Sequence, residues 1–299
     1  MFSFNVRNPV NARNHRCLSG VLMNRFPSIA FIGGGNMANA LVSGLLGQGC
    51  AANSLHVVEV ANTLRQQWQA RGISVASAPD QTLGAQQVWI LAVKPQQMRE
   101  VVLQCKPWLT PNTLVISIAA GISMASLTTW LGSPTQPFTR VVRCMPNTPA
   151  LVAAGVTGMA AVAGLPQPEQ EIAAKVLGAV GQVVWVESDQ ALDAVTALSG
   201  SGPAYVFLFL EALIAGAQAL GLSATQARSL ALATLAGSTK LAAESTESPS
   251  VLRERVTSTG GTTAAALDVF MQLDFSNIVA QAMAAANTRA GELSAEFGR

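Results

Sequence analysis

A glycine-rich turn between an apolar segment and an amphipathic one constrains this chain more than any other feature. Residues 29–32 are all apolar and predict a buried parallel strand. They run directly into Gly33-x-Gly35-x-x-Ala38, and small and apolar residues then recur at helical spacing. A strand, a glycine turn and a helix in this order are typical of a Rossmann βαβ unit.

Each small residue of the turn has a physical role. Gly33 permits a tight turn, Gly35 lets the backbone approach a pyrophosphate, and Ala38 lets the helix pack closely on the strand. Asn36 and Met37 open the helix, whose unpaired N–H groups and partial positive charge face the phosphates. These residues therefore predict a dinucleotide site.

Further candidates for this site follow later strands. Glu59 ends a second apolar segment, where a carboxylate accepts hydrogen bonds from an adenosine ribose. Another apolar strand ends at Val93 and is followed by Lys94, which is placed either to reach the cofactor or to be a solvated loop lysine. Ala119 and Ala120 follow the next strand and are small enough for a backbone to approach the nicotinamide.

Strand and helix patterns alternate up to residue 187. They predict an α/β Rossmann domain over residues 27–187, with a mostly parallel, doubly wound sheet. The strand signal then ends, and residues 188–299 predict an all-helical domain. Residues 204–220 are apolar almost all round, which favours a helix buried in a subunit interface over a membrane span. Glu211 at its centre is expected to be a structural group with a buried partner.

The composition excludes some classes of function. Only 11% of the 299 residues are charged and the formal net charge is +2, which argues against a nucleic-acid groove. The four cysteines are widely spaced, so no metal site or disulfide framework is expected and a reducing cytoplasm is favoured. Residues 1–26 bear arginines and no acid. We interpret them as a disordered extension or a misassigned start, with a transit peptide as the alternative.

The most unusual polar stretch is residues 256–267. It places several hydroxyl groups around Gly260 and Gly261, directly before a predicted helix. Free N–H groups at a helix start, with hydroxyl donors beside them, form a pocket for a small carboxylate. Taken alone, the stretch is explained better by an ordinary serine or threonine cap with a glycine turn.

Six motifs occur in order along the chain. They are Phe31-Ile-Gly-Gly-Gly-Asn-Met37, Ala92-Val-Lys-Pro95, Ser117-Ile-Ala-Ala-Gly121, Arg143-Cys-Met-Pro-Asn-Thr-Pro149, Leu198-Ser-Gly-Ser-Gly-Pro-Ala-Tyr205 and Thr257-Ser-Thr-Gly-Gly-Thr-Thr263. Together they make the chain resemble the Δ1-pyrroline-5-carboxylate reductases. The resemblance implies reduction of a cyclic imine to L-proline with NADPH or NADH. It also implies a helical domain that forms homodimers, or pentamers of dimers, with no membrane or nucleic-acid partner.

The resemblance implies residue roles as well. The substrate carboxylate would lie on the loop formed by Ser258, Gly260, Gly261, Thr262 and Thr263. The hydroxyl of Thr263 would hydrogen-bond the ring nitrogen and so be the catalytic group. The glycine turn, Lys94 and the two alanines at 119 and 120 would line the cofactor.

Two positions depart from the family pattern. Thr259 stands where the family often has proline, which changes the stiffness of the loop. Glu59 stands where a residue suited to a 2′-phosphate is common, and a carboxylate there would repel that phosphate and favour NADH. Arg65 is placed to reach back and weaken this preference.

The scarcity of histidine constrains the mechanism. The chain has only His15 and His56, so a histidine acid–base mechanism is not expected, and an imine needs less acid catalysis than a ketone does. A β-hydroxyacid dehydrogenase is one alternative, but it needs a catalytic lysine on the helix over residues 204–220, which has none. A nucleotide sensor is another, and it would have no need of a carboxylate pocket.

Overall fold

The structure is a computed structural model that describes residues 26–298. Apart from Phe26, the predicted extension over residues 1–26 lies outside the described residues. Within residues 26–298 a single sheet has the strand order β3-β2-β1-β4-β5-β6-β7-β8. The strands are Ile29–Ile32 (β1), Leu55–Val58 (β2), Ser74–Ala76 (β3), Val88–Leu91 (β4), Leu114–Ser117 (β5), Val141–Met145 (β6), Gly155–Ala161 (β7) and Gly181–Trp185 (β8).

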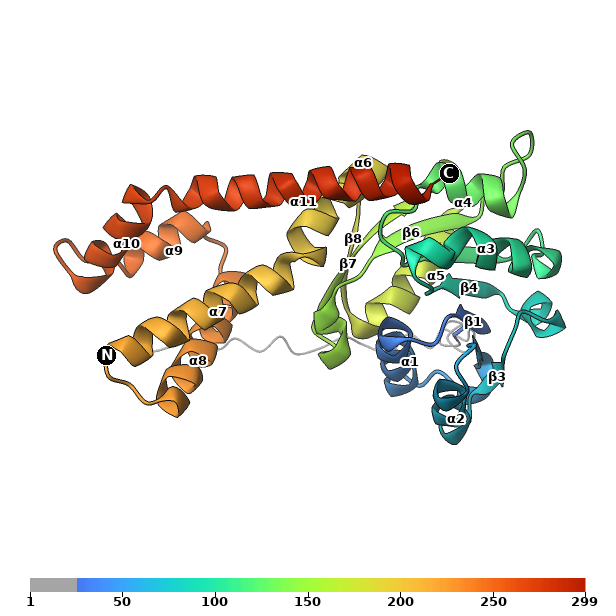
Figure 1. The fold of residues 1–299 in the computed structure, drawn as a ribbon, viewed down its shortest axis with the longest axis horizontal. Coiled ribbons are helices and arrows are strands. Elements are labelled where there is room, and N and C mark those ends of the chain that lie inside the picture. The colour runs from blue at the N-terminus through green and yellow to red at the C-terminus, as the bar shows by residue number, and fades with distance from the viewer. Residues whose placement is uncertain (1–25, 299) are drawn as a thin grey trace, which may run out of the picture.

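Helices cover both faces of this sheet because its inner strands are apolar on both sides (Figure 1). On β1, Ile29 and Phe31 belong to the cluster that packs under α1, α2 and α5, whereas Ala30 and Ile32 face α3 and α4. These helices span Asn36–Gly47 (α1), Asn62–Ala70 (α2), Pro95–Cys105 (α3), Met124–Leu131 (α4) and Gln167–Leu177 (α5). The predicted doubly wound α/β sheet is confirmed.

One pair of strands is antiparallel. β6 pairs with β7 in opposite directions, while the remaining neighbours are parallel. The connection from β6 to β7 is a short 3-10 turn, Thr148–Val152, followed by Ala153 in the left-handed region with φ of 56°. A crossover helix would be needed to return the chain parallel, and this connection is too short to hold one.

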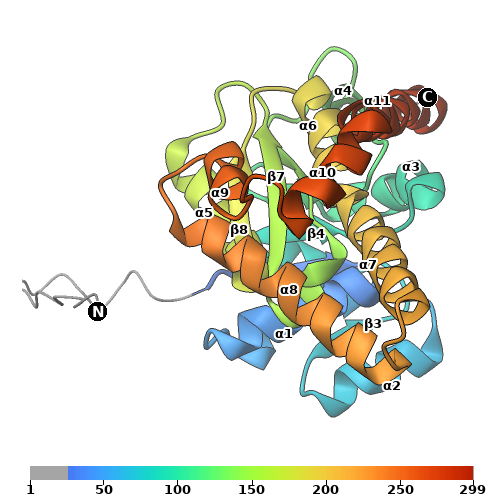
Figure 2. The same cartoon turned by 90° about the vertical axis from the view of Figure 1, so that its left-hand side faces the viewer.

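The remaining chain is helical, as predicted. It comprises Asp189–Val195 (α6), Gly202–Ala219 (α7), Ala224–Glu244 (α8), Pro249–Arg255 (α9), Thr262–Gln272 (α10) and Phe275–Phe297 (α11). Figure 2 shows α7, α8 and α10 standing in front of the sheet, and α7 packs directly on α8. These helices bury few side chains in the single chain, and α7 and α10 bury none.

The single chain does not supply the buried partner expected for Glu211, which stays a prediction for a subunit interface. Glu211 is exposed, because the helix that carries it has little protein around it. Val206, Phe207 and Leu208 on the same helix are 53%, 58% and 68% exposed. An apolar surface of this extent calls for a second protein surface to cover it. By length and composition alone, the continuous helical run Asp189–Ala219 could also cross a bilayer.

The last helix returns to the sheet domain. Figure 1 shows α11 running from the neighbourhood of α10 across to α4. Near its end, the hydroxyl of Ser126 on α4 donates to the carbonyl oxygen of Gly298 at 2.8 Å. Gly121 lies so close to Leu293 that a Cβ at position 121 would come within 2.9 Å of the Leu293 Cβ. α11 is therefore docked on the loop that follows β5.

Candidate active site

A cavity of about 420 Å³ opens at the carboxyl ends of β1 to β4. The strand order reverses between β1 and β4, and such a switch point is where open α/β sheets bind ligands. Its lining residues come from the ends of these strands and from α3. They are Ile32–Gly35, Val58–Val60, Ser77–Pro79, Ala92–Lys94, Gln97, Glu100, Val101 and Gln104.

The glycine turn forms one wall of this cavity. Gly33 has φ of +100°, donates its N–H to the carbonyl of Val58 at 2.9 Å, and leaves no room for a Cβ, which would lie 2.7 Å from the oxygen of Ala92. Gly35 is the N-cap of α1, without a side-chain cap, and a Cβ there would meet nothing within 4 Å. An anionic group can thus approach the unpaired N–H groups of α1.

The Glu59 carboxylate is held on the cavity wall by two backbone donors. The N–H of Gly34 donates to Oε2 and the N–H of Ala61 donates to Oε1, each at 2.8 Å. Arg65 bends back, as predicted, and donates to the carbonyl oxygens of Glu59 and Val60 at 2.8 and 2.7 Å. An acid and a guanidinium therefore flank the place where a ribose would bind.

The structure brings part of the predicted cofactor set to this cavity. The residues on its wall are Gly33, Gly35, Glu59, Val93 and Lys94. Asn36, Met37 and Ala38 continue α1 behind the glycine turn, and Ala119 and Ala120 follow β5 on the same edge of the sheet. For all ten residues, a cofactor contact stays a prediction.

Sequence reasoning missed another wall of the cavity. Ser77, Ala78 and Pro79 line it beside Glu59, directly after β3. The signal was available, because a loop at the carboxyl end of a parallel strand adjoins the ligand crevice. Strand β3 has only three residues, which makes its end inconspicuous in the sequence.

The hydroxyl-rich loop precedes α10, as predicted. Gly260 has φ of +70°, and the N–H of Gly261 donates to the carbonyl of Ser258 at 3.0 Å. Gly261 is the N-cap of α10 and no side chain caps the helix. Thr262 and Thr263 form its exposed first turn, so their N–H groups and hydroxyls are free to receive a small carboxylate.

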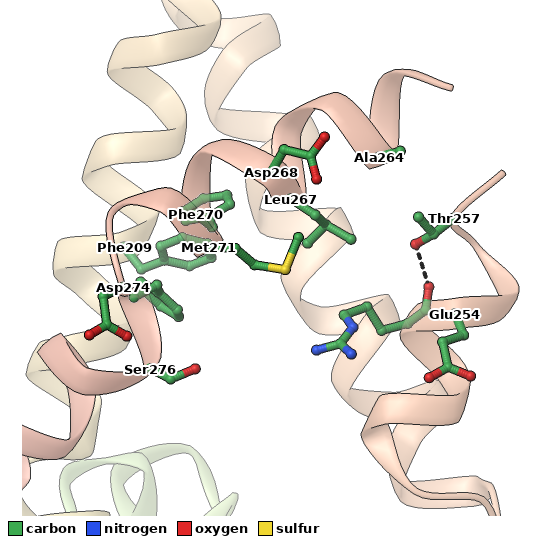
Figure 3. A pocket seen from close by; sticks show the side chains of 12 residues that line it. Phe209, Glu254, Thr257, Ala264, Leu267, Asp268, Phe270, Met271, Asp274 and Ser276 are labelled. Atoms are coloured by element: carbon green, nitrogen blue, oxygen red, sulfur yellow. Dashed lines mark hydrogen bonds between the residues drawn. The ribbon is translucent and has the colours of Figure 1, made fainter. Parts of the chain in front are cut away.

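A second cavity, of about 740 Å³, lies beside this loop among α7, α9, α10 and α11. Figure 3 shows Phe209 and Phe270 close together on one side of it. The ring of Phe275 lies against both, with centroids 6.5 Å from Phe209 and 5.3 Å from Phe270. Thr257 reaches its rim, where the hydroxyl donates to the carbonyl of Arg253 at 2.6 Å. The aromatic wall suits an apolar protein surface.

His56, the one histidine among residues 26–298, lines neither of the two cavities. His56 is 3% exposed within β2, and its ring nitrogens contact the hydroxyls of Ser74 and Thr82 at 3.0 and 3.1 Å. Burial lowers the pKa of His56, opposed by the negative charge of Asp80. The imidazole is therefore a neutral structural group at neutral pH, in line with the expectation that no histidine acts as the acid.

Both halves of the chain match known families. Residues 189–293 match the family described as pyrroline-5-carboxylate reductase dimerisation, and residues 28–121 match the one described as NADP oxidoreductase, coenzyme F420-dependent. The chain is 42% identical to the pyrroline-5-carboxylate reductase of Pseudomonas aeruginosa over 274 residues, which cover 91% of this chain and 99% of that protein. The chain belongs to the pyrroline-5-carboxylate reductase family.

Solved structures of pyrroline-5-carboxylate reductases share the fold. The enzyme from Coxiella burnetii matches with a TM-score of 0.84 and 38% identity, over 90% of this chain and 99% of that one. Pyrroline carboxylate reductase from Plasmodium falciparum, solved with NADP bound, matches with a TM-score of 0.79 and 27% identity, over 90% and 98%. Membership of this family excludes the β-hydroxyacid dehydrogenase and the nucleotide sensor.

Proposed function

We propose that this chain reduces Δ1-pyrroline-5-carboxylate to L-proline with NAD(P)H, the last step of proline biosynthesis. The observation that carries the proposal is its 42% identity to a pyrroline-5-carboxylate reductase along 99% of that protein. So long a match includes both the glycine turn and the hydroxyl-rich loop. Turnover of the imine with oxidation of the cofactor and formation of L-proline is the expected result, and folded protein without turnover would contradict it.

The cavity at the glycine turn suits the cofactor. Gly33 makes the tight turn, and Gly35 at the uncapped start of α1 leaves the N–H groups of the helix open where a longer side chain would block a pyrophosphate. Lys94, exposed at the N-cap of α3, adds a positive charge on the same wall. A bound nicotinamide would supply the hydride that adds to the carbon of the C=N bond.

The hydroxyl-rich loop suits the substrate. The uncapped N–H groups of α10 and the hydroxyl of Ser258 would bind the carboxylate, and the Thr263 hydroxyl would donate to the ring nitrogen. A cyclic imine takes up its proton near neutral pH, so positioning and one hydrogen bond meet most of the catalytic need. A neutral, buried His56 is in keeping with this mechanism.

We also propose that one active site takes residues from two copies of the chain. Figure 1 shows α10 at the opposite end of the molecule from β1 and α1. The hydroxyl-rich loop of one chain would therefore act on the cofactor of its partner. The exposed apolar side chains of α7 and the aromatic wall of Phe209, Phe270 and Phe275 support a dimer of this kind. We further propose that five such dimers assemble into a pentamer of dimers.

For the cofactor we propose a preference for NADH. The Glu59 carboxylate, held in place by two N–H groups, puts a negative charge where a 2′-phosphate would lie. Arg65 opposes it, but its guanidinium already donates to two carbonyl oxygens and to Asn62. The preference is measured as the ratio of kcat/KM for NADH to that for NADPH.

Replacing Glu59 tests this preference. Glu59→Gln should shift the ratio towards NADPH by about tenfold or more, because it removes a charge beside the phosphate. Glu100 lies on the same cavity, so Glu100→Gln removes an equal charge as a matched control and should leave the ratio nearly unchanged. A wild-type preference for NADPH, with no change in Glu59→Gln, would show that Glu59 does not select the cofactor.

Two further proposals concern the whole chain. We propose that the Rossmann domain ends near residue 187, because the sheet ends at Trp185 and α6 begins at Asp189. We propose a cytoplasmic location, which the free and buried thiols of Cys50, Cys105 and Cys144 support. Burial raises the pKa of Cys105 to about 12, so this thiol stays protonated and unreactive.

A further inference from the structure

The join between the two halves of the chain carries a polar contact that neither candidate site uses. There α6 continues through a π-helical turn, Thr196–Gly200, into α7. Asn147, just after β6, is 9% exposed and donates from Nδ2 to the carbonyl oxygen of Ser199 at 3.1 Å. Its Oδ1 accepts from the N–H of Val156 at 3.0 Å. One buried side chain thus joins the sheet edge, the start of β7 and the turn.

The two partners require an amide at position 147. A carbonyl oxygen can only accept and a backbone N–H can only donate, so the orientation of the Asn147 amide is determined by its partners. An ionised aspartate of the same shape would keep the bond from Val156 but lose the donor to Ser199. An apolar side chain would lose both.

Pro203 explains why the Ser199 carbonyl needs an outside donor. In a regular helix this oxygen would accept the N–H four residues ahead, and position 203 has no N–H to donate. Neighbouring donors are directed elsewhere, since Ser201 donates to Thr196 at 2.8 Å and Ala204 donates to Ser201 at 2.9 Å. Asn147 supplies the missing donor from the sheet.

The turn is packed tightly on the sheet around this contact. A Cβ at Gly200 would lie 2.6 Å from the Met145 Cε, and one at Gly158 would lie 2.5 Å from Val195 Cγ1. Both approaches bring α6 and the π turn against β6 and β7. Because α7 follows the turn directly, the position of the turn sets the direction in which α7 leaves the sheet.

We propose that Asn147 is a positioning residue of the reductase. By holding the Ser199 carbonyl, it sets the angle between the cofactor-binding sheet and the helical half that carries the hydroxyl-rich loop. Its kinetic consequence rests on the proposed function and its shared site, because the substrate must lie between the cofactor of one chain and the loop of its partner. The angle at this join sets where the helical halves bring that loop in the dimer. The structural consequence of Asn147, an ordered π turn, rests on neither.

Asn147→Asp is the first test, with Asn112→Asp as a control that makes the same change at an exposed site. At pH 8, kcat/KM of Asn147→Asp should fall by about 100-fold, the effect of a misplaced reacting group, with an unchanged dissociation constant for the cofactor. As the pH falls towards 5, activity relative to wild type should recover, because a protonated carboxyl can again donate to Ser199. Arg143, Asp189 and Asp193 also carry charge where α6 meets the sheet. All variants contain these three residues, so their effect on the pH profile is shared with wild type and is removed by the comparison.

Pro203→Ala is the second test, because it returns an N–H that can pair with Ser199. In the Pro203→Ala background the loss caused by Asn147→Asp should shrink to about tenfold or less, as expected of coupled residues. An undiminished loss there would overturn the proposal. So would a single variant that matches wild type at every pH, or a loss that does not recover at low pH. If the single variant does not fold, the double variant is compared with Pro203→Ala alone.

Amide hydrogen exchange separates this proposal from the proposed function. Without substrate, Asn147→Asp at pH 8 should exchange faster than wild type over residues 196–208, with no change over residues 29–48. Unchanged exchange over residues 196–208 would show that Asn147 does not hold the turn. A wild-type protein that fails to reduce the imine would contradict the proposed function and leave this measurement valid.

Discussion

At the scale of single residues, the hydroxyl of Thr263 has the most direct consequence for catalysis. It lies exposed in the first turn of α10, where no side chain caps the helix. Thr263→Ala should lower kcat by about 100-fold, because the donor to the developing amine is lost. The affinity for the cofactor should hardly change. Steady-state kinetics and a fluorescence titration of the cofactor measure the two quantities.

The conservative variant Thr263→Ser is the control for this prediction. It keeps a hydroxyl at the same position, so it should retain kcat to within about tenfold of wild type. Equal turnover by Thr263→Ala and wild type would remove this residue from the mechanism.

At the scale of elements, the docking of α11 on the loop after β5 depends on a glycine. Gly121 has φ of +69° and no room for a Cβ beside Leu293. Gly121→Ala should lower the free energy of unfolding by about 1–3 kcal/mol through backbone strain and overpacking. It should also raise KM for the cofactor, because Ala119 and Ala120 precede it in the same loop. Thermal denaturation and kinetics check both.

Gly47→Ala is the matched control for Gly121→Ala. Gly47 is the last residue of α1, and a Cβ there would meet nothing within 4 Å. This substitution should be neutral, or should stabilise the protein by about 0.5–1 kcal/mol, as alanine does in a helix. A Gly121→Ala protein as stable as the control would show that α11 is not held closely at this loop.

At the scale of the whole molecule, a site shared between two chains predicts complementation. Gly35→Asp should fold, since a Cβ at Gly35 meets nothing within 4 Å, but its carboxylate would repel the pyrophosphate. Thr263→Ala is defective at the other end of the chain. Mixed dimers of these two inactive variants would contain one site with neither substitution, so subunit exchange should restore measurable turnover.

The control for complementation is each variant mixed with itself under the same conditions, which should restore nothing. Restored activity that scales with the mixed-dimer fraction, seen by native mass spectrometry, would support the shared site. Mixed dimers without activity would mean that Thr263 acts on the cofactor of its own chain.

The sequence by itself determined the features that depend on local backbone and periodicity. Gly33 needs positive φ where a strand turns sharply into a helix, and Gly260 needs it in the loop before α10, so both turns are visible as glycines. The buried strands are visible because a parallel sheet covered on both faces is apolar without interruption. The fold class and the two candidate loops follow from such signals.

Only the tertiary structure decided what depends on contacts between distant segments. The Glu59 carboxylate is fixed by the N–H of Gly34, and Asn147 is fixed by the carbonyl of Ser199, and neither partner is visible from spacing along the chain. Glu211 is exposed in the single chain, and its predicted buried partner stays a prediction for a subunit interface. An apolar helix shows the need for a covering surface without showing which residues provide it. Periodicity records the environment of a residue, whereas the identity of its neighbours is set by how the elements pack.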